Sequence, residues 1–262
     1  MSLHYTSAAS LIWLISIATT PGHANDIRFD QSNPTIMTLN ITQIGIGHAI
    51  QGLAADTVTA EPTSGASLTG NFDTVSLQQT SIGNSTIALN IDVGLDASSD
   101  VLIDISGSGT HNVMLDAVAQ ELTSITTLDG PGAKSVNTYV DALGKLVSHD
   151  IRLSGSAIDL YANQQASADL LVELFSLGSL LVPLPASVSI KQTGEGSAAH
   201  ILGTIDTDAT LVFDQTGSET NYTLDVTLNL SSSLALNQIS DGGVASGLKV
   251  VVPIGQTITI TQ

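Results

Sequence analysis

The chain has 262 residues, which is enough for one large domain or two modest ones with a sizeable core. It carries 24 acidic and 6 basic residues, and a surface with the resulting formal net charge of −18 repels nucleic acid and anionic lipid. The sequence contains no cysteine, which excludes disulfides, thiolate catalysis and cysteine-ligated metals. Aromatic residues make up only 3%, while threonine, valine, isoleucine and serine are frequent, so strands are expected rather than helices.

Residues 1–24 are typical of a secretory signal peptide. Residues 11–18 form its apolar core, and Gly22 and Ala24 supply the small residues expected just before a cleavage site. The stretch departs from the usual pattern because no Lys or Arg precedes the apolar core. We expect cleavage after Ala24 and secretion of a mature chain that begins at Asn25, which would be extracellular or held at the cell surface.

Residues 25–130 form a first β-repeat region, in which two alternating apolar residues are followed by Gln, and a small residue comes two positions later. Because side chains alternate along a strand, the apolar pair and the Gln share one face. The two copies are Leu39, Ile41 and Gln43 with Gly45, and Val75, Leu77 and Gln79 with Ser81. A third copy has Ile105 where Gln is expected, so any glutamine ladder should be interrupted there.

Residues 131–185 fit the repeat poorly, and we expect an irregular insertion. Pro131 and Gly132 break regular structure at its start. Residues 135–147 and 166–181 have apolar spacings that do not decide between short helices and irregular strands.

Residues 186–262 form a second β-repeat region of three 23-residue units. Each unit closes its first strand with a glutamine (Gln192, Gln215, Gln238), and a small residue follows two positions later (Gly194, Gly217, Ser240). A unit of strand, turn and strand cannot bury its own apolar face, so copies must stack. Stacking at about 4.8 Å would place each amide over the next and satisfy a group that otherwise costs about 1–3 kcal/mol to bury.

The pattern therefore predicts an all-β fold of stacked strand–turn–strand repeats, similar to a β-solenoid, with an irregular or partly helical middle section. We expect one structural ladder formed by the five glutamines Gln43, Gln79, Gln192, Gln215 and Gln238, with turns at Gly45, Ser81, Gly194, Gly217 and Ser240. The alternative is an antiparallel β-sandwich whose glutamines lie at strand ends and face water.

The Gln-x-Gly step after an alternating strand, repeated behind a signal peptide, resembles the curlin repeat. That repeat runs as Ser, five residues, Gln-x-Gly, two residues, Asn-x-Ala, three residues, Gln. Its first Gln is matched at all five positions above, and its Gly at Gly45, Gly194 and Gly217. Its second Gln is absent from all five blocks. The resemblance implies a stack that adds subunits end to end, as in the extracellular amyloid fibres of bacterial biofilms.

The sequence contains no recognisable catalytic, cofactor-binding or metal-binding motif. His48, His111, His149 and His200 are isolated in the sequence and lack the spacing of a zinc site, so a surface or capping role is expected. Gly45 and Gly47 do not complete a dinucleotide fingerprint. The sequence therefore predicts no catalytic, cofactor-binding or metal-binding residue, and a protein that is not an enzyme.

These observations favour a secreted structural protein: a curlin-like fibre subunit, a nucleator or an accessory component of a bacterial extracellular matrix. Its expected partners are copies of itself or related fibre subunits, with no nucleic acid and no membrane insertion once the signal is removed. The alternative is a soluble extracellular β-rich adhesion or binding domain without enzymatic activity. Because protonation of the many carboxylates near pH 4 reduces self-repulsion, acid should promote association.

Overall fold

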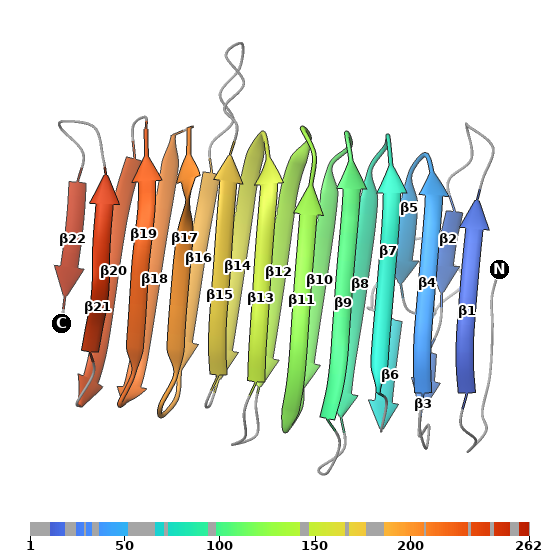
Figure 1. The fold of residues 1–262 in the computed structure, drawn as a ribbon, viewed down its shortest axis with the longest axis horizontal. Coiled ribbons are helices and arrows are strands. Elements are labelled where there is room, and N and C mark those ends of the chain that lie inside the picture. The colour runs from blue at the N-terminus through green and yellow to red at the C-terminus, as the bar shows by residue number, and fades with distance from the viewer. Residues whose placement is uncertain are drawn as a thin grey trace, which may run out of the picture.

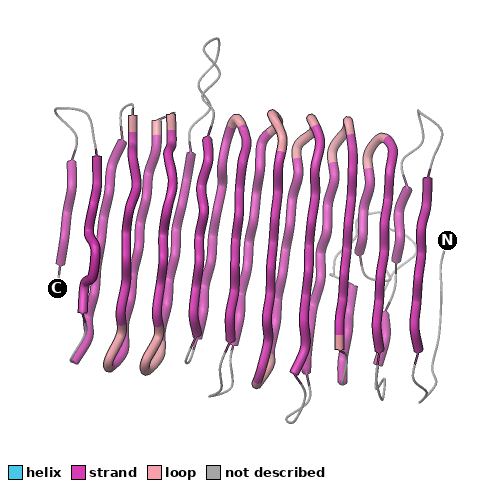
Figure 2. The backbone as a smooth tube through the Cα atoms, in the orientation of Figure 1, coloured by secondary structure: helices cyan, strands magenta, loops and turns pink. Residues whose placement is uncertain are grey.

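The computed structural model describes most of the chain. The described residues are 11–18, 25–28, 30–32, 37–51, 66–70, 73–93, 98–141, 147–165, 168–176, 186–206, 208–229, 232–241, 244–251 and 257–261. All regular structure in these ranges is β-strand, and none of it is helix (Figure 2).

Two parallel sheets lie face to face, and the chain passes from one to the other after nearly every strand (Figure 1). The ten-stranded sheet contains β1 (Leu11–Ala18), β4 (Met37–Gly45), β7 (Thr74–Ser81), β9 (Ser98–Gly107), β11 (Glu121–Asp129), β13 (Val147–Gly155), β15 (Ala168–Ser176), β17 (Ala198–Ile205), β19 (Asn221–Leu228) and β21 (Val244–Val251). Its strand order follows the sequence, so the fold is a β-solenoid in which successive rungs stack along one axis.

The twelve-stranded sheet follows the same rule. Its order is β2 (Asn25–Arg28), β5 (His48–Gln51), β8 (Ser85–Val93), β10 (His111–Val118), β12 (Ala133–Asp141), β14 (Ala157–Gln165), β16 (Ala186–Thr193), β18 (Ala209–Ser218), β20 (Ser232–Asp241) and β22 (Thr257–Thr261). Two further short strands complete it: β3 (Asp30–Ser32) pairs with β6 (Ala66–Gly70), which pairs with β8.

Every described strand pair is parallel, which confirms the stacked-repeat fold and excludes the antiparallel sandwich. The described pairing has one register shift in the C-terminal region, between β19 and β21. There Tyr222 pairs with Ala245, but Leu224 pairs with Leu248 instead of the Gly247 that a constant 23-residue spacing requires. The extra residue forms a bulge.

The core consists of columns of inward-facing side chains that run along the stack. One column of the twelve-stranded sheet is aliphatic throughout: Ile27, Ile50, Ile87, Val113, Val136, Leu160, Val188, Leu211, Leu234 and Ile258. All of these except Ile258 are at most 4% exposed. Each fully buried aliphatic side chain contributes about 1.5–3 kcal/mol, so packing stabilises the fold without disulfides.

The segment expected to be an irregular insertion is regular over most of its length. β12, β13, β14 and β15 pair with their neighbours in register. β12 and β15 overlap the stretches 135–147 and 166–181, where short helices or irregular strands were expected. The period-2 pattern is obscured because the polar residues Lys134, Thr138 and His149 occupy buried, inward positions. Pro131 and Gly132 do interrupt a strand, but only at the turn between β11 and β12. Residues 177–185 lie outside the described residues.

The apolar core of the expected signal peptide forms β1, which pairs with β4 from Leu11 opposite Met37 onward. The predicted cleavage after Ala24 would remove β1 and leave β4 as the first strand of the ten-stranded sheet. Residues 1–10 and 19–24 of the expected signal peptide lie outside the described residues.

Close stacking leaves no room for side chains at some turn glycines. Gly107 has a φ of 126°, and a Cβ added there would lie 1.7 Å from the carbonyl oxygen of Ser81 on the preceding rung. We expect Gly107→Ala to lower the free energy of unfolding by about 2–4 kcal/mol, because backbone strain adds to the clash. Urea denaturation should show this loss, whereas the adjacent Ser106→Ala should change stability by less than about 0.5 kcal/mol. Equal stability of the two variants would contradict the packing described here.

Candidate functional site

The three C-terminal glutamines form a buried amide ladder. They occupy one column of the twelve-stranded sheet, where Gln192 pairs with Gln215 and Gln215 with Gln238. Nε2 of Gln215 donates to Oε1 of Gln192 at 2.8 Å, and Nε2 of Gln238 donates to Oε1 of Gln215 at 3.0 Å. Their exposed fractions are 0%, 0% and 6%, so the ladder lies in the dry interior, as the sequence predicted for this region.

The same amides also connect the two sheets. Gln192 donates to the carbonyl oxygen of Ala198 at 3.0 Å, and Gln215 donates to that of Asn221 at 2.9 Å. Both acceptors lie at the start of the following strand in the ten-stranded sheet. Each glutamine thus uses one amide hydrogen along the stack and one across the turn, which satisfies carbonyl groups at the end of the core.

Sequence reasoning missed a fourth member of this ladder. Gln164 of β14 pairs with Gln192, whose Nε2 lies 3.4 Å from Oε1 of Gln164. Leu160, Ala162 and Gln164 repeat the pattern of two alternating apolar residues and a glutamine. This copy of the repeat was not recognised because Gln164 lies 28 positions before Gln192, instead of the 23 positions between the other glutamines of the ladder. The longer spacing comes from the longer connection between β15 and β16.

The expectation of one five-membered ladder is wrong. Gln43 and Gln79 form a separate pair in the ten-stranded sheet, with Nε2 of Gln79 donating to Oε1 of Gln43 at 2.7 Å. They lie where β4 and β7 end, at the edge opposite the ends of β16, β18 and β20 (Figure 1). The sequence pattern marks a strand end before a turn, and a solenoid has such turns at both edges. As predicted, Ile105 follows Gln79 in the column and interrupts the ladder.

The five predicted turn residues all close strands, by two different means. Gly45, Gly194 and Gly217 have φ values of 149°, 156° and 155°, which favour glycine. Ser81 instead uses its hydroxyl, which accepts from the backbone N–H groups of Gly47 and Gly83, both at 3.0 Å. Ser240 likewise accepts from the N–H of Thr220 at 3.4 Å. The serines therefore hold neighbouring turns together where glycine is absent.

A second polar column closes the core in the N-terminal half. His48, Ser85, His111 and Lys134 occupy consecutive positions in the twelve-stranded sheet, and all four are buried. Nε2 of His111 donates to the carbonyl oxygen of Gly107 at 3.2 Å, and Nζ of Lys134 donates to that of Gly132 at 3.1 Å. These side chains bond to turn carbonyls as the glutamines do. The expected capping role therefore fits His111, whereas His48 is a core residue.

Burial lowers the pKa values of the basic side chains in this column. It lowers the pKa of Lys134 to about 8, although the carboxylate of Asp129 opposes the shift. Burial and the neighbouring Lys134 ammonium both lower the pKa of His111, while burial lowers that of His48. The histidines are therefore favoured in their neutral form, which limits the charge placed inside the core.

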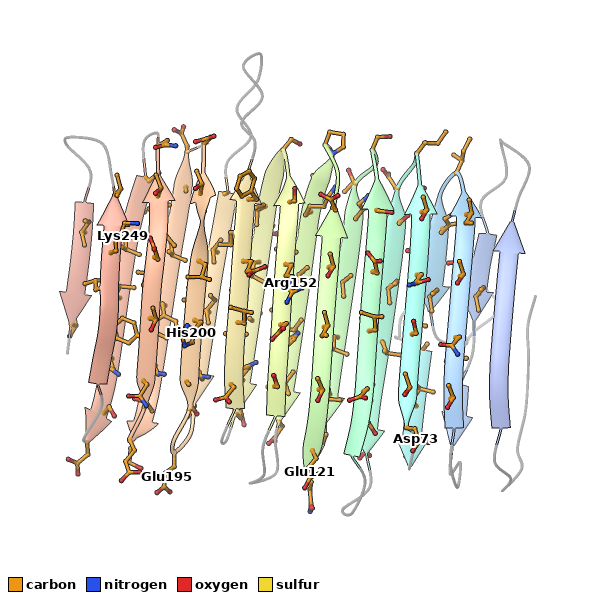
Figure 3. The ribbon with its side chains drawn as sticks, viewed as in Figure 1. Asp73, Glu121, Arg152, Glu195, His200 and Lys249 are labelled. Carbon is orange, nitrogen blue, oxygen red and sulfur yellow. The ribbon has the colours of Figure 1, made fainter. Side chains whose placement is uncertain are left out.

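His149 is a fully buried titratable group of the ten-stranded sheet. It lies in β13 between Ser124 and Leu170 of the flanking strands and is 0% exposed. Burial lowers its pKa to about 4, so the imidazole is neutral at pH 7. The expected surface role is wrong for His149, whereas His200 is exposed on the outer face of the same sheet (Figure 3).

Ion pairs join neighbouring rungs on the outer face of the ten-stranded sheet, where Figure 3 labels Arg152 and Lys249. Nε of Arg152 lies 3.3 Å from a carboxylate oxygen of Glu173, and Nζ of Lys249 lies 3.0 Å from one of Asp225. Because all four side chains are between 46% and 67% exposed, each pair contributes less than about 1 kcal/mol. These contacts reinforce the register without determining it.

Within the described ranges, no group of three or more His, Asp or Glu is placed to hold a metal ion. The same ranges contain no helix capable of crossing a membrane.

Comparisons with protein-family models, curated proteins and solved structures give no match to this chain.

Proposed function

We propose that this chain is a secreted structural protein that assembles end to end: a curlin-like fibre subunit, nucleator or accessory component of a bacterial extracellular matrix. The observation that carries the proposal is an exposed core position on the last described rung of the stack. Ile258 of β22 continues the aliphatic column beyond Leu234, yet it is 41% exposed whereas Leu234 is 2% exposed. An inward-facing isoleucine that stays exposed on the last described rung offers apolar surface on which another chain can pack.

Backbone groups at the same end support the proposal. β21 and β22 are the outermost described strands at this end of their sheets. No described strand pairs with the outer edge of either, so this edge presents N–H and C=O groups for pairing. An incoming strand that pairs with such an edge gains main-chain hydrogen bonds and continues the sheet. The partners we propose are copies of this chain or related fibre subunits, joined through sheet edges rather than through a catalytic cleft.

The N-terminal end has matching register positions. Ile27 of β2 begins the aliphatic column that Ile258 ends. Gln31 of β3 pairs with Leu68, at the head of the column that leads to Gln164 and Gln238. A head-to-tail contact would therefore continue both columns across the junction. Because the two joined surfaces differ, such contacts form an open chain of subunits unless the rotation closes a ring.

Replacing Ile258 with aspartate should slow seeded fibre elongation of the chain that begins at Asn25 by at least about tenfold. A charge at this position must lose its water when the next rung covers it. Thr259→Asp is the matched control, since it adds the same charge to the outward face of the same strand. It should slow elongation by less than about threefold.

Fibre diffraction provides the structural readout, with a reflection expected near about 4.7 Å. Equal elongation rates for the two variants would remove the C-terminal rung from the mechanism. A wild-type chain that stays monomeric for weeks at high concentration would favour the alternative, a soluble extracellular adhesion or binding domain.

A further inference from the structure

The outer face of the twelve-stranded sheet carries a compact grid of aromatic, amide and thioether side chains. It spans β8, β10, β12 and β14 and consists of two columns. The first is Ala88, Met114, Asn137 and Tyr161, and the second is Asn90, Asp116, Tyr139 and Asn163. Adjacent members of a column are about 4.8 Å apart because they occupy neighbouring strands.

The grid contains a shallow depression of about 230 Å³. Its lining includes Asn90, Met114, Asp116, Asn137 and Tyr139, so it presents apolar surface next to hydrogen-bonding groups. Tyr161 lies beside it, in register with Asn137, and is 44% exposed, while Met114 is 56% exposed. A concave apolar surface with a few polar groups is the usual form of a small-ligand site.

The composition of the chain makes this cluster unusual. Only four tyrosines occur in 262 residues, and two of them lie on adjacent strands of this one face. Tyr222, by contrast, is buried, with its ring centroid 5.4 Å from that of Phe213. The outward rings of Tyr139 and Tyr161 add nothing to the core between the sheets. Outward-facing aromatic and thioether groups gathered in and beside a depression are instead typical of recognition surfaces.

We propose that this grid binds a neutral, linear glycan. The C–H-bearing face of a sugar ring packs on the face of a tyrosine ring, and the hydroxyls that project from its edge bond to amides and carboxylates. Asn90 and Asn137 supply both donors and acceptors, and Asp116 supplies acceptors. The diagonal from Tyr139 to Tyr161 lets consecutive sugar rings of one extended chain meet both aromatic rings.

The negative charge of the chain determines which class of glycan the grid can bind. The chain carries a net charge of −18, and Asp116 lies inside the grid, so uronic or sulfated sugars are repelled. The grid also lies on the outer face of a sheet rather than at its edge strands. Glycan binding is therefore independent of end-to-end assembly, and both the monomer and any fibre would present the site.

Binding can be followed by titrating the chain that begins at Asn25 with neutral hexasaccharides of β-glucose, β-N-acetylglucosamine and α-glucose, and with hexagalacturonate as the acidic probe. That chain lacks tryptophan, so its intrinsic fluorescence comes from Tyr139, Tyr161 and Tyr222. At least one neutral probe should change this fluorescence saturably, and hexagalacturonate should not. Saturable binding of hexagalacturonate as tight as that of the best neutral probe would overturn the proposal, as would the absence of binding by every neutral probe.

Variants locate the site. Tyr139→Ala and Tyr161→Ala should each weaken binding at least about tenfold in calorimetry, whereas Tyr161→Phe, which keeps the ring, should stay within about threefold of wild type. Phe175→Ala is the matched control, because it removes a 53% exposed aromatic ring from the other sheet. Circular dichroism confirms folding of each variant. Equal losses in Phe175→Ala and the tyrosine variants would refute the assignment.

Discussion

Replacing Gln215 with alanine should lower the free energy of unfolding by about 3–5 kcal/mol. Gln215 lies in the middle of the C-terminal ladder, where it donates to Gln192 and Asn221 and accepts from Gln238. Its removal takes a hydrogen-bond partner from each of these three groups in a buried interior, where a group left unsatisfied costs about 1–3 kcal/mol. Nε2 of Gln238 keeps the carbonyl oxygen of Thr220 as an acceptor at 3.3 Å, so its loss is the smallest. Relaxation of the neighbouring side chains recovers part of that sum, and the vacated space costs more where it persists.

Urea denaturation measures this effect, and the neighbouring residue provides the control. Thr216 follows Gln215 on the same strand but is exposed, so Thr216→Ala should change stability by less than about 0.5 kcal/mol. A loss below about 1 kcal/mol in Gln215→Ala would show that water or neighbouring groups replace the amide.

Replacing Gln192, Gln215 and Gln238 together by leucine has a different expected result. When both partners of a buried hydrogen bond become apolar, the loss of that bond can be nearly neutral, which holds here for the bonds between the glutamines. The carbonyl groups of Ala198 and Asn221 still lose their amide donors, so we expect a moderate loss of stability from these two groups. The variant would still lose the hydrogen bonds that specify the register of neighbouring strands. Leucine side chains pack almost equally well when a strand shifts along its neighbour, whereas glutamine amides lose their hydrogen bonds. We therefore expect the triple variant to fold, but to form fibres more slowly or with altered morphology. Unchanged growth would remove the ladder from the assembly mechanism.

Acid should destabilise the fold through His149. Burial lowers its pKa to about 4 in the folded chain, against an ordinary value of 6.5. A group with a depressed folded pKa is neutral in the fold but takes up a proton on unfolding. The stability from neutral His149 is therefore complete above pH 6.5 and is lost as the pH falls from 6.5 towards 4. The total loss is about 3 kcal/mol.

Comparison of unfolding free energies at pH 7 and pH 4 tests this assignment. His149→Leu should remove about 3 kcal/mol of the acid-induced loss, whereas leucine at the exposed His200 should remove almost none. If the wild type and His149→Leu lose the same stability between these pH values, other groups control acid unfolding. Acid-promoted association, which follows from the net charge, should persist in both variants because the carboxylates are unchanged.

The parts of the fold that follow a local rule could be predicted from the sequence. The constant spacing of Gln192, Gln215 and Gln238, with alternating apolar residues before each, was sufficient to predict parallel stacking in register. The middle strands could not be recognised in this way. Lys134 and His149 are inward-facing because their neighbours on adjacent rungs fix the register, and this constraint is absent from the local pattern.

The sequence predicted buried glutamine amides that bond along the stack, but it did not predict which glutamines form each ladder. A glutamine before a turn specifies its own strand end, but not which sheet contains that strand, so Gln43 could not be separated from Gln192 by sequence alone. Gln164 was missed because connections between rungs vary in length, which changes the spacing in sequence without changing the spacing in space. The buried histidines gave no signal, since burial depends on strands that are distant in the chain.

The parallel arrangement of every described strand pair gives the molecule a direction. Its two ends are chemically unlike, since β2 and β3 carry Asp26, Arg28 and Asp30 whereas β22 carries only Thr and Ile. Subunits that join head to tail, as proposed, all point the same way, so a filament built from them is polar. Its two tips then elongate at unequal rates, and a molecule that caps one tip leaves the other free to grow.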